Sequence, residues 1–393
     1  MNMATKKDVF QEKLGAYAAA DKRGKGAILD AVALVSGLAR KAVIRRFRRM
    51  QLRGRQGEQK RGRPRTYTND VIAALKEAWE IGSEACGENL HPMIGEYVAT
   101  TQSERSWQHT SEATEKLLRM SLGSVKGYVG GFTRTRRGFG GKSTTRKSSV
   151  MSMVPIRMDG WDKAEAGVTQ IDTVAHCGDT TAGDFVFTTN ATDVATLWGT
   201  RRAQWNKGQE ATLVSLVAMR EDSPIPWTEM HPDSGSEFIN AQCIRYAEDT
   251  GLRMTRSRPY HKNDNCFVEE RNGHVVRAYV GYMRLDVFEV VEALNALYAV
   301  LTLYLNHFIA SRRIVSKERI GAKWKVTRER VARTPHQRVL DRTDVSTDAK
   351  DTLRAEHARL NPKAMKAEID RLTEEVFAVQ RRYGTPRKLS KAV

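Results

Sequence analysis

The chain has 393 residues, 40% of them hydrophobic, and a formal net charge of +19 at pH 7. This length is too great for one ordinary hydrophobic core, so we expect two to four domains. The positive charge favours a polyanionic partner, nucleic acid before an anionic membrane surface. The four cysteines lack CxxC spacing, so they give no support for zinc and are typical of isolated thiols in a reducing compartment.

Residues 1–60 predict a helix-turn-helix DNA-binding domain. Apolar residues recur at helical spacing on both sides of a Ser36–Gly37 break. The helix after the break is rich in arginine and lysine, as a helix in a major groove would be. A plain helical hairpin with a solvated basic face is the alternative. We expect DNA contacts from Arg40, Lys41, Arg45, Arg46 and Arg49.

Residues 61–132 predict a second helical DNA-binding region, entered through the basic segment KRGRPR at residues 60–65. This segment resembles an AT-hook core, because Gly62 and Pro64 keep the backbone narrow and extended enough for a minor groove. A basic linker that contacts only phosphates is the alternative. The arginines expected on DNA here are Arg61, Arg63 and Arg65.

Residues 133–160 predict a basic linker. Between Thr133 and Ser149 it holds six lysines and arginines and no acid, in a background of glycine, serine and threonine. Such a segment is typical of a flexible connector that follows DNA phosphates. We expect contacts from Arg136, Arg137 and Lys142.

The composition changes at residues 161–310, which predict an α/β core. Three β-branched and aromatic segments come first, followed by the order helix, strand, helix, strand, helix, which is typical of a mixed five-stranded sheet with helices on both faces. We expect a helix from Ser236 and another from Asp264, with Asp264 as its N-cap. The most apolar segment, residues 287–305, carries two glutamates and is predicted to be a buried core helix and not a membrane span.

Three acidic positions in this core suggest a metal site. Asp172 lies inside the first strand, where aspartate is disfavoured, and Asp233 lies at the end of the fourth, where α/β sheets bind ligands. The last helix carries Glu269 and Glu270, which point about 100° apart and cannot both face one site. Carboxylates suit Mg²⁺, and two such ions about 4 Å apart can support phosphoryl displacement.

The segments IDTVAHCG, DSGSEFIN and TRSRPYHKNDNCFVEERN resemble the DDE integrase and transposase catalytic core, of the RNase H-like fold. That family places 35 residues between its second aspartate and its glutamate. Thirty-five residues separate Asp233 from Glu269, and 36 separate it from Glu270, so the resemblance selects Glu269. One departure is Ser234, where the family often has asparagine. The N-terminal helices and the segment ARTPHQRVL are similar to those of bacterial insertion-sequence transposases.

This resemblance implies a DNA transposase that binds terminal inverted repeats, cuts 3′ ends and joins them to target DNA by transesterification. It implies catalytic and metal-binding roles for Asp172, Asp233 and Glu269, with two Mg²⁺ (or Mn²⁺). The implied partners are double-stranded DNA and further copies of the chain, as a homodimer or higher multimer, with no membrane and no small-molecule substrate. The expected location is the bacterial cytoplasm, at the nucleoid. A metal-dependent nuclease of the same fold and a non-catalytic regulator derived from a transposase are the alternatives.

The remaining polar residues are weaker candidates. Arg258 and Lys262 precede the last core helix and are candidates for a DNA phosphate. Glu237 is expected to support the first turn of its helix, and Asp193 to have a structural role in a turn. His176 is not expected to be a ligand, and Phe187 and Trp198 are expected in the core. Residues 311–393 predict a basic, mostly helical C-terminal region that includes an irregular cationic segment and a terminal helix.

Overall fold

The computed structural model describes residues 3–55, 66–132, 150–157, 161, 165–258, 264–321 and 323–384. The chain divides into two compact units, Met1–Thr66 and Tyr67–Val393. Several residues for which the sequence predicts DNA contacts lie outside the described residues, namely Arg61, Arg63, Arg65, Arg136, Arg137, Lys142 and Lys262.

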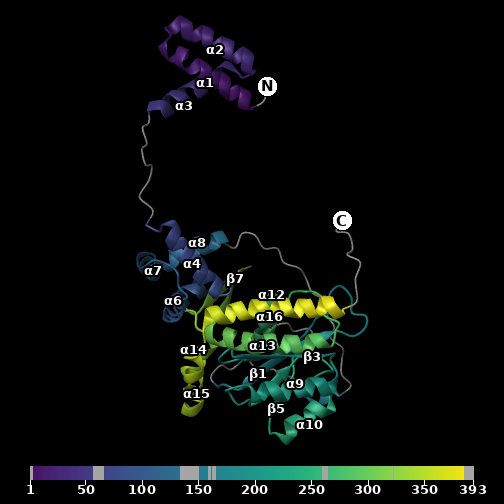
Figure 1. Ribbon diagram of the computed structural model, residues 1–393. Helices are drawn as coiled ribbons and strands as arrows, with labels where there is room; N and C mark the ends of the chain where they lie inside the picture. The colour runs from purple at the N-terminus through teal and green to yellow at the C-terminus, as the bar shows by residue number, and fades with distance from the viewer. Residues whose placement is uncertain are drawn as a thin grey trace. The chain divides into compact units, whose positions relative to one another are not determined.

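The first unit consists of α1 (Met3–Ala19), α2 (Lys22–Ser36) and α3 (Arg40–Arg55) (Figure 1). The Asp21 carboxylate accepts a hydrogen bond from the Gly24 amide at 2.8 Å and so caps α2. Gly37, with φ of +67°, ends this helix in a conformation that favours glycine. The two helices predicted around the Ser36–Gly37 break are therefore present. They pack with α1 around a small core of Phe10, Leu29, Val32, Val43 and Phe47.

The second unit begins with a helical region of α4 (Asn69–Ile81), α5 (Gly87–Leu90), α6 (Ile94–Ser103), α7 (Ser111–Leu118) and α8 (Leu122–Phe132). A short 3₁₀ turn, His91–Met93, joins α5 to α6. On α4 the apolar residues recur at helical spacing, and Val71, Leu75 and Trp79 are buried as this pattern predicts. Helices α4 to α8 contribute to the same hydrophobic core as the helices that cover the sheet.

The sheet consists of β1 (Val168–Ala175), β2 (Val186–Asp193), β3 (Gly199–Trp205), β4 (Glu229–Pro232) and β5 (Arg253–Met254). Its strand order is β3-β2-β1-β4-β5. The first three strands form an antiparallel meander, and β4 pairs parallel with β1 and β5 parallel with β4. The predicted α/β core with a mixed five-stranded sheet, flanked by helical regions, is confirmed.

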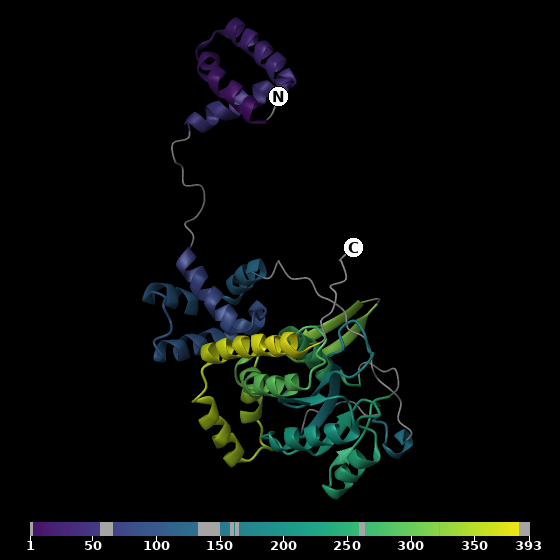
Figure 2. The ribbon, with the colours of Figure 1, turned by 45° about the vertical axis from the view of Figure 1, so that its right-hand side comes forward.

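Helices cover the sheet on both faces (Figure 2). They are α9 (Gln209–Glu221), α10 (Ala241–Asp249), α11 (Cys266–Arg271), α12 (Arg277–Val280) and α13 (Glu289–Phe308), with a π-helical turn at Asn272–Val276 between α11 and α12. α13, predicted as a buried core helix, contributes Leu294, Leu297 and Leu301 to the core with no exposed surface. Among the described residues, no helix combines the length and apolar character needed to cross a membrane.

Two predicted helix starts are wrong. The helix expected from Ser236 begins at Ala241, because the Asn240 side chain accepts hydrogen bonds from the Gln242 and Cys243 amides and caps it there. The helix expected to be capped by Asp264 begins at Cys266. Asp264 instead forms a two-pronged ion pair with Arg258, with N···O distances of 2.9 and 2.8 Å. Both errors arose because a nearby polar group competed for the capping position.

After α13 the chain forms α14 (Pro335–Leu340), α15 (Thr347–His357) and α16 (Pro362–Tyr383). The long terminal helix α16 packs along α13 (Figure 1) and buries Met365, Ile369, Leu372 and Val376. The segments that the sequence divides into helical region, catalytic core and C-terminal region thus share one hydrophobic core. Ile156 forms an isolated parallel β-bridge to Arg256, just after the edge strand β5. The end of the predicted linker therefore lies beside the sheet.

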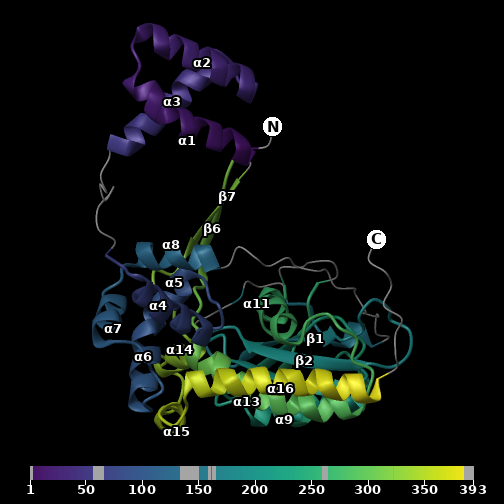
Figure 3. The same ribbon diagram turned by 45° about the horizontal axis from the view of Figure 1, so that its top comes forward.

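The cationic segment after α13 is not irregular as predicted, because it contains a β-hairpin of β6 (Ile314–Ile320) and β7 (Lys323–Arg328). Every residue of β7 is exposed, and Figure 3 shows the hairpin projecting from the rest of its unit. Gly321, with φ of +62°, begins the two-residue connection between the strands. A strand with no buried face lacks the apolar and polar alternation by which strands are recognised in a sequence.

The base of this hairpin is fixed by Glu329. Its carboxylate pairs with Arg313 at 3.0 Å and with both terminal nitrogens of Arg338 at 2.7 and 2.6 Å. Burial alone would raise the pKa of Glu329, but the hydrogen bonds from Arg338 and from the Arg313 amide lower it to about 2. The hairpin therefore projects from a rigid, ion-paired base.

Replacing Glu329 with glutamine is expected to lower the free energy of unfolding by about 3 kcal/mol at pH 7, because the buried Arg338 guanidinium would lose its counter-charge. A depressed carboxyl pKa stabilises the fold above the unfolded pKa and ceases to do so as the pH falls towards 2. The difference between wild type and Glu329→Gln in urea unfolding should therefore shrink from pH 5 to pH 3. Glu318→Gln, on the exposed hairpin, is the control and should change stability by less than about 0.5 kcal/mol. Equal stability of all three proteins at pH 7 would show that the ion pairs of Glu329 do not stabilise the fold.

Candidate functional site

Asp172 lies in the middle of β1, directly opposite Asn190 of β2. One carboxylate oxygen accepts a hydrogen bond from the Thr173 amide at 2.8 Å, and the other accepts one from the Asn272 side chain at 2.6 Å. The Asn190 side chain in turn donates to the Asn272 side-chain oxygen Oδ1 at 3.0 Å. The carboxylate is therefore held in one orientation, while Asp172 keeps part of its surface accessible.

Asp233 follows directly after β4, the parallel neighbour of β1. Its carboxylate accepts a hydrogen bond from the Gly235 amide at 2.9 Å. The negative charge of Asp233 acts on Asp172 strongly enough to raise the pKa of that residue, after the larger effect of burial. The structure therefore brings these two predicted residues together on the neighbouring inner strands β1 and β4, at the point where β4 ends.

Glu269 lies on α11, whose start is attached to β1 by Gln170. The Gln170 side-chain oxygen Oε1 accepts hydrogen bonds from the Phe267 and Val268 amides at 2.9 and 3.2 Å. The charge of Glu269 contributes to the raised pKa of both Asp172 and Asp233. Asn272, almost one turn later on the face of Glu269, is the residue that bonds to Asp172. Glu269 therefore lies near enough to both aspartates for its charge to raise their pKa values.

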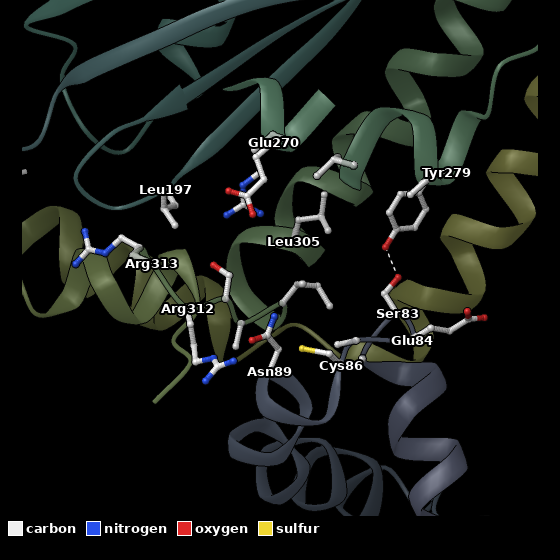
Figure 4. A pocket seen from close by; sticks show the side chains of 18 of the residues that line it. Ser83, Glu84, Cys86, Asn89, Leu197, Glu270, Tyr279, Leu305, Arg312 and Arg313 are labelled. Carbon is white, nitrogen blue, oxygen red and sulfur yellow. Dashed lines mark hydrogen bonds between the residues drawn. The ribbon is translucent and has the colours of Figure 1, made fainter. Parts of the chain in front are cut away.

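Glu270 lies on a different side of α11. It lines a cavity of about 1320 Å³ whose wall also includes Arg312 and Arg313 (Figure 4). Its charge acts on the neighbouring Arg271, while it is not among the charges that shift the pKa of Asp172 or Asp233. The two adjacent glutamates therefore face different surroundings.

Glu237 joins the carboxylates, although the sequence assigned it to the first turn of a helix. That helix begins only at Ala241, and Glu237 is 3% exposed. One of its oxygens lies 3.3 Å from the Thr173 hydroxyl and 3.6 Å from the Lys207 ammonium, and the other is buried with no hydrogen-bond partner. The assignment was wrong because the turn after β4 is five residues longer than the pattern suggested.

Sequence reasoning also missed the neutral residues that orient the acids, namely Gln170, Asn190 and Asn272. One signal was available for two of them. Gln170 and Asp172 are two residues apart and so share one face of β1, and a buried amide on the face of a buried carboxylate indicates a polar site. The π-helical turn that begins at Asn272 gives no sequence signal, yet such turns are frequent at functional sites.

The four carboxylates carry more negative charge than the surrounding residues neutralise. Burial and the charge of Asp233 raise the pKa of Asp172 well above its usual value, and burial and Glu237 raise the pKa of Asp233 to about 6. A half-buried group of acids is costly unless protons or cations neutralise it. The oxygen-only donor set and the unpartnered oxygen of Glu237 fit a hard divalent cation such as Mg²⁺.

Asp233→Asn is expected to stabilise the metal-free protein by up to about 3 kcal/mol at pH 7, because the ionised carboxylate is disfavoured in the fold. With a pKa of about 6 in the fold against 3.8 as the ordinary value, the native state binds more protons between these pH values. The stability that Asp233→Asn gains over wild type should therefore grow as the pH rises from 4 to 7, while the other titrating groups act alike in both proteins. Urea unfolding in EDTA measures this difference, with the exposed Asp249→Asn as control. A difference that stays constant over this range would contradict it.

The predicted DNA-contacting residues that are described have mixed surroundings. Lys41, Arg45 and Arg49 are exposed on α3. Arg40 pairs with Asp30 at 2.6 Å, and the Arg46 guanidinium lies over the Phe10 ring. Arg258 pairs with Asp264, so it stabilises the loop before α11. The DNA contacts of these residues stay predictions.

The lesser candidates have structural surroundings. The Asp193 carboxylate accepts hydrogen bonds from Gly167 and Thr196 at the end of β2. His176 is fully buried and bonds to the Thr188 hydroxyl at 2.8 Å, and burial lowers its pKa to about 3. Phe187 and Trp198 are core residues as predicted.

The segment that the sequence predicts to be cationic and irregular forms the β6–β7 hairpin, which gives its charges two distinct faces. Lys317 and Arg319 of β6 lie opposite Val326 and Trp324 of β7, and the Lys317 ammonium lies 5.0 Å from the centre of the Trp324 ring. This face also includes Arg328, so it carries three cations, an exposed tryptophan and no acid. The opposite face pairs Glu318 with Lys325 and Ile320 with Lys323. The two faces therefore differ in acid content, with three cations on one and two on the other.

No family model matches the chain. Among solved structures, the catalytic core domain of BIV integrase aligns with a TM-score of 0.29 and 12% identity, over 50% of this chain and 99% of that one. A chain of the simian T-cell lymphotropic virus intasome in complex with PP2A regulatory subunit B56 gamma aligns with a TM-score of 0.30 and 13% identity, over 55% of this chain and 69% of that one.

A much stronger likeness is found in sequence. The uncharacterized protein y4rM of Sinorhizobium fredii is 31% identical over 324 residues, which span 82% of this chain and 92% of that protein. The chain belongs to the same protein family as y4rM.

Proposed function

We propose that this protein is a DNA transposase that cuts the 3′ ends of a mobile element and joins them to target DNA. The observation that carries the proposal is that Asp172 and Asp233 lie on neighbouring strands of a mixed five-stranded sheet, where the charge of Glu269 acts on both. The net charge of +19 and the exposed cations of α3 and of the hairpin supply the means to bind DNA.

Asp172, Asp233 and Glu269 would hold two Mg²⁺ (or Mn²⁺), and Glu237 adds a fourth carboxylate beside them. When bound, such ions activate a water or 3′ hydroxyl and stabilise the leaving oxygen during in-line phosphoryl displacement. The protein's own contribution is orientation. Asn272 fixes the Asp172 carboxylate, and Gln170 fixes the start of the helix that carries Glu269. No serine or tyrosine nucleophile is required.

The partners in this proposal are the element ends, the target DNA and a second copy of the chain. Two ends must be cut and joined together, which requires at least a dimer on DNA. The helices of the first unit would recognise the terminal inverted repeats, with exposed Lys41, Arg45 and Arg49 at the DNA.

A strand-transfer assay tests the proposal. The substrates are the DNA segments that flank the coding region, supplied as pre-cut ends, and a supercoiled plasmid as target. We expect Mg²⁺-dependent joined products with wild type and none with Asp172→Asn. Metal-dependent hydrolysis without joining would favour the nuclease alternative. DNA binding with neither activity, in a protein that binds no divalent ion at the acids, would favour the regulator.

A further inference from the structure

Three histidines from three helices meet at a place remote from the carboxylates in the sequence. They are His307 at the end of α13, His336 on α14 and His357 at the end of α15. One ring nitrogen of each lies within 4.8 Å of one ring nitrogen of the others. His307 is fully buried and His336 is 5% exposed. Imidazoles so close together and so far from water require an explanation.

Hydrogen bonding determines which nitrogens carry protons. His307 Nε2 lies 3.1 Å from a carboxylate oxygen of Glu356, and an ionised carboxylate only accepts, so this nitrogen donates. His357 Nε2 lies 3.1 Å from a carboxylate oxygen of Glu96. A neutral imidazole has one N–H, so Nδ1 of His307 is left with a bare lone pair. The Glu96 oxygen that faces His357 accepts no hydrogen bond, so this contact does not fix the tautomer of His357. These two Nδ1 atoms face each other at 3.1 Å.

At that distance the two rings are joined either by a hydrogen bond from His357 Nδ1 to His307 Nδ1 or by a cation between two lone pairs. The third ring favours the cation, because His336 Nε2 is buried with no hydrogen-bond partner, while the ring bonds to the Leu353 backbone. In metal sites a ligating histidine commonly donates its other nitrogen to a carboxylate or a backbone carbonyl. His307 and His336 follow that pattern, and His357 Nε2 lies 3.1 Å from a Glu96 oxygen.

We propose that His307, His336 and His357 form a binding site for a transition-metal ion, Zn²⁺ in the first place. Neutral imidazole suits Zn²⁺, whereas Mg²⁺ prefers oxygen, so this site and the carboxylates select different ions. Zn–N bonds of about 2.0–2.1 Å place tetrahedral nitrogens about 3.4 Å apart, close to the 3.1 Å seen for His307 and His357. His336 must turn from its stack on His357, where the ring centres lie 4.4 Å apart, to complete the site.

The bound ion would connect elements that are far apart in the chain. α13 covers the sheet, α14 and α15 follow the hairpin, and Glu96 of α6 belongs to the helical region before the core. Three protein nitrogens around one ion would fix these elements together, which is the role of a structural zinc site. The inference does not depend on the proposed transposase function.

Metal titration of the full-length protein tests the site. Protein stripped with EDTA and returned to Mg²⁺ buffer is titrated with Zn²⁺ against a chromophoric chelator, and with Co²⁺ while the visible absorption is recorded. We expect one equivalent of Zn²⁺ per chain and the visible bands of tetrahedral Co²⁺. His336→Gln and His357→Gln should weaken Zn²⁺ binding at least 100-fold. His176→Gln, at a buried histidine outside the cluster, is the matched control and should bind as wild type.

The titration also has outcomes that overturn the inference. A folded wild type that binds no Zn²⁺ would show that a shared proton joins His307 to His357 in place of a metal. Zinc binding that persists in His336→Gln and His357→Gln would assign the ion to the exposed thiols of Cys86 and Cys266. Binding that disappears in Asp172→Asn but persists in His357→Gln would assign it to the carboxylates. The stoichiometry of wild type remains decisive even if a histidine variant does not fold.

Discussion

Glu269→Gln is expected to lower the rate of Mg²⁺-dependent DNA cleavage about 1,000-fold or more, whereas Glu270→Gln should leave it within about threefold of wild type. The two residues are adjacent, equally charged and both exposed, so the pair is closely matched. Only Glu269 acts electrostatically on Asp172 and Asp233, and only Glu270 lines the cavity with Arg312 and Arg313. Cleavage of DNA that carries the element ends is the measurement.

The interpretation needs a control for DNA binding and for folding. Both variants remove one negative charge, so neither should lose affinity for DNA, and their thermal unfolding should be similar. If Glu270→Gln is the inactive variant, the spacing that selected Glu269 is wrong. If both variants cleave as wild type, the carboxylates are not the catalytic centre and the proposed function fails with them.

The core could be predicted because each of its strands has a strong local pattern. β1 to β3 are β-branched and aromatic runs separated by glycine and aspartate, and the two helices of the core that begin after turns are amphipathic. Asp172 was identifiable because a carboxylate inside a buried strand is unusual. Asp233 was identifiable because it ends a strand that neighbours β1.

Other features could not be predicted, because they depend on competition between nearby polar groups or on contacts between distant segments. Glu237 was placed on a helix because serine and asparagine are both good N-caps, so the sequence does not show that Asn240, and not Ser236, begins the helix. Asp264 is an acceptable N-cap by residue type, but the Arg258 guanidinium competes for it. The histidine cluster combines positions 50 residues or fewer apart that no periodicity connects. In each case a nearby polar group or a distant segment decides the outcome.

The second large effect is expected for the acid-free face of the hairpin. Replacing Lys317 and Arg319 with glutamine should weaken binding to duplex DNA about 30-fold at 0.1 M salt and reduce the slope of log K against log salt by about 2. A two-stranded ribbon fits the major groove of B-DNA, and this hairpin is held at its base by Glu329 and exposed along its length. Trp324, 56% exposed beside these cations, adds an apolar contact to the same face.

Lys323→Gln with Lys325→Gln is the matched control, because it removes two charges from the opposite face of the same hairpin. If the ribbon lies on DNA with its acid-free face, this control should reduce the salt slope by less than 1. Equal slopes for both double variants would mean that the hairpin acts only as a diffuse positive charge. An unchanged slope for Lys317→Gln with Arg319→Gln, together with a loss of dimers in sedimentation, would assign the face to a second copy of the chain. The salt slope therefore distinguishes a groove contact from both alternatives, which affinity at one salt concentration cannot do.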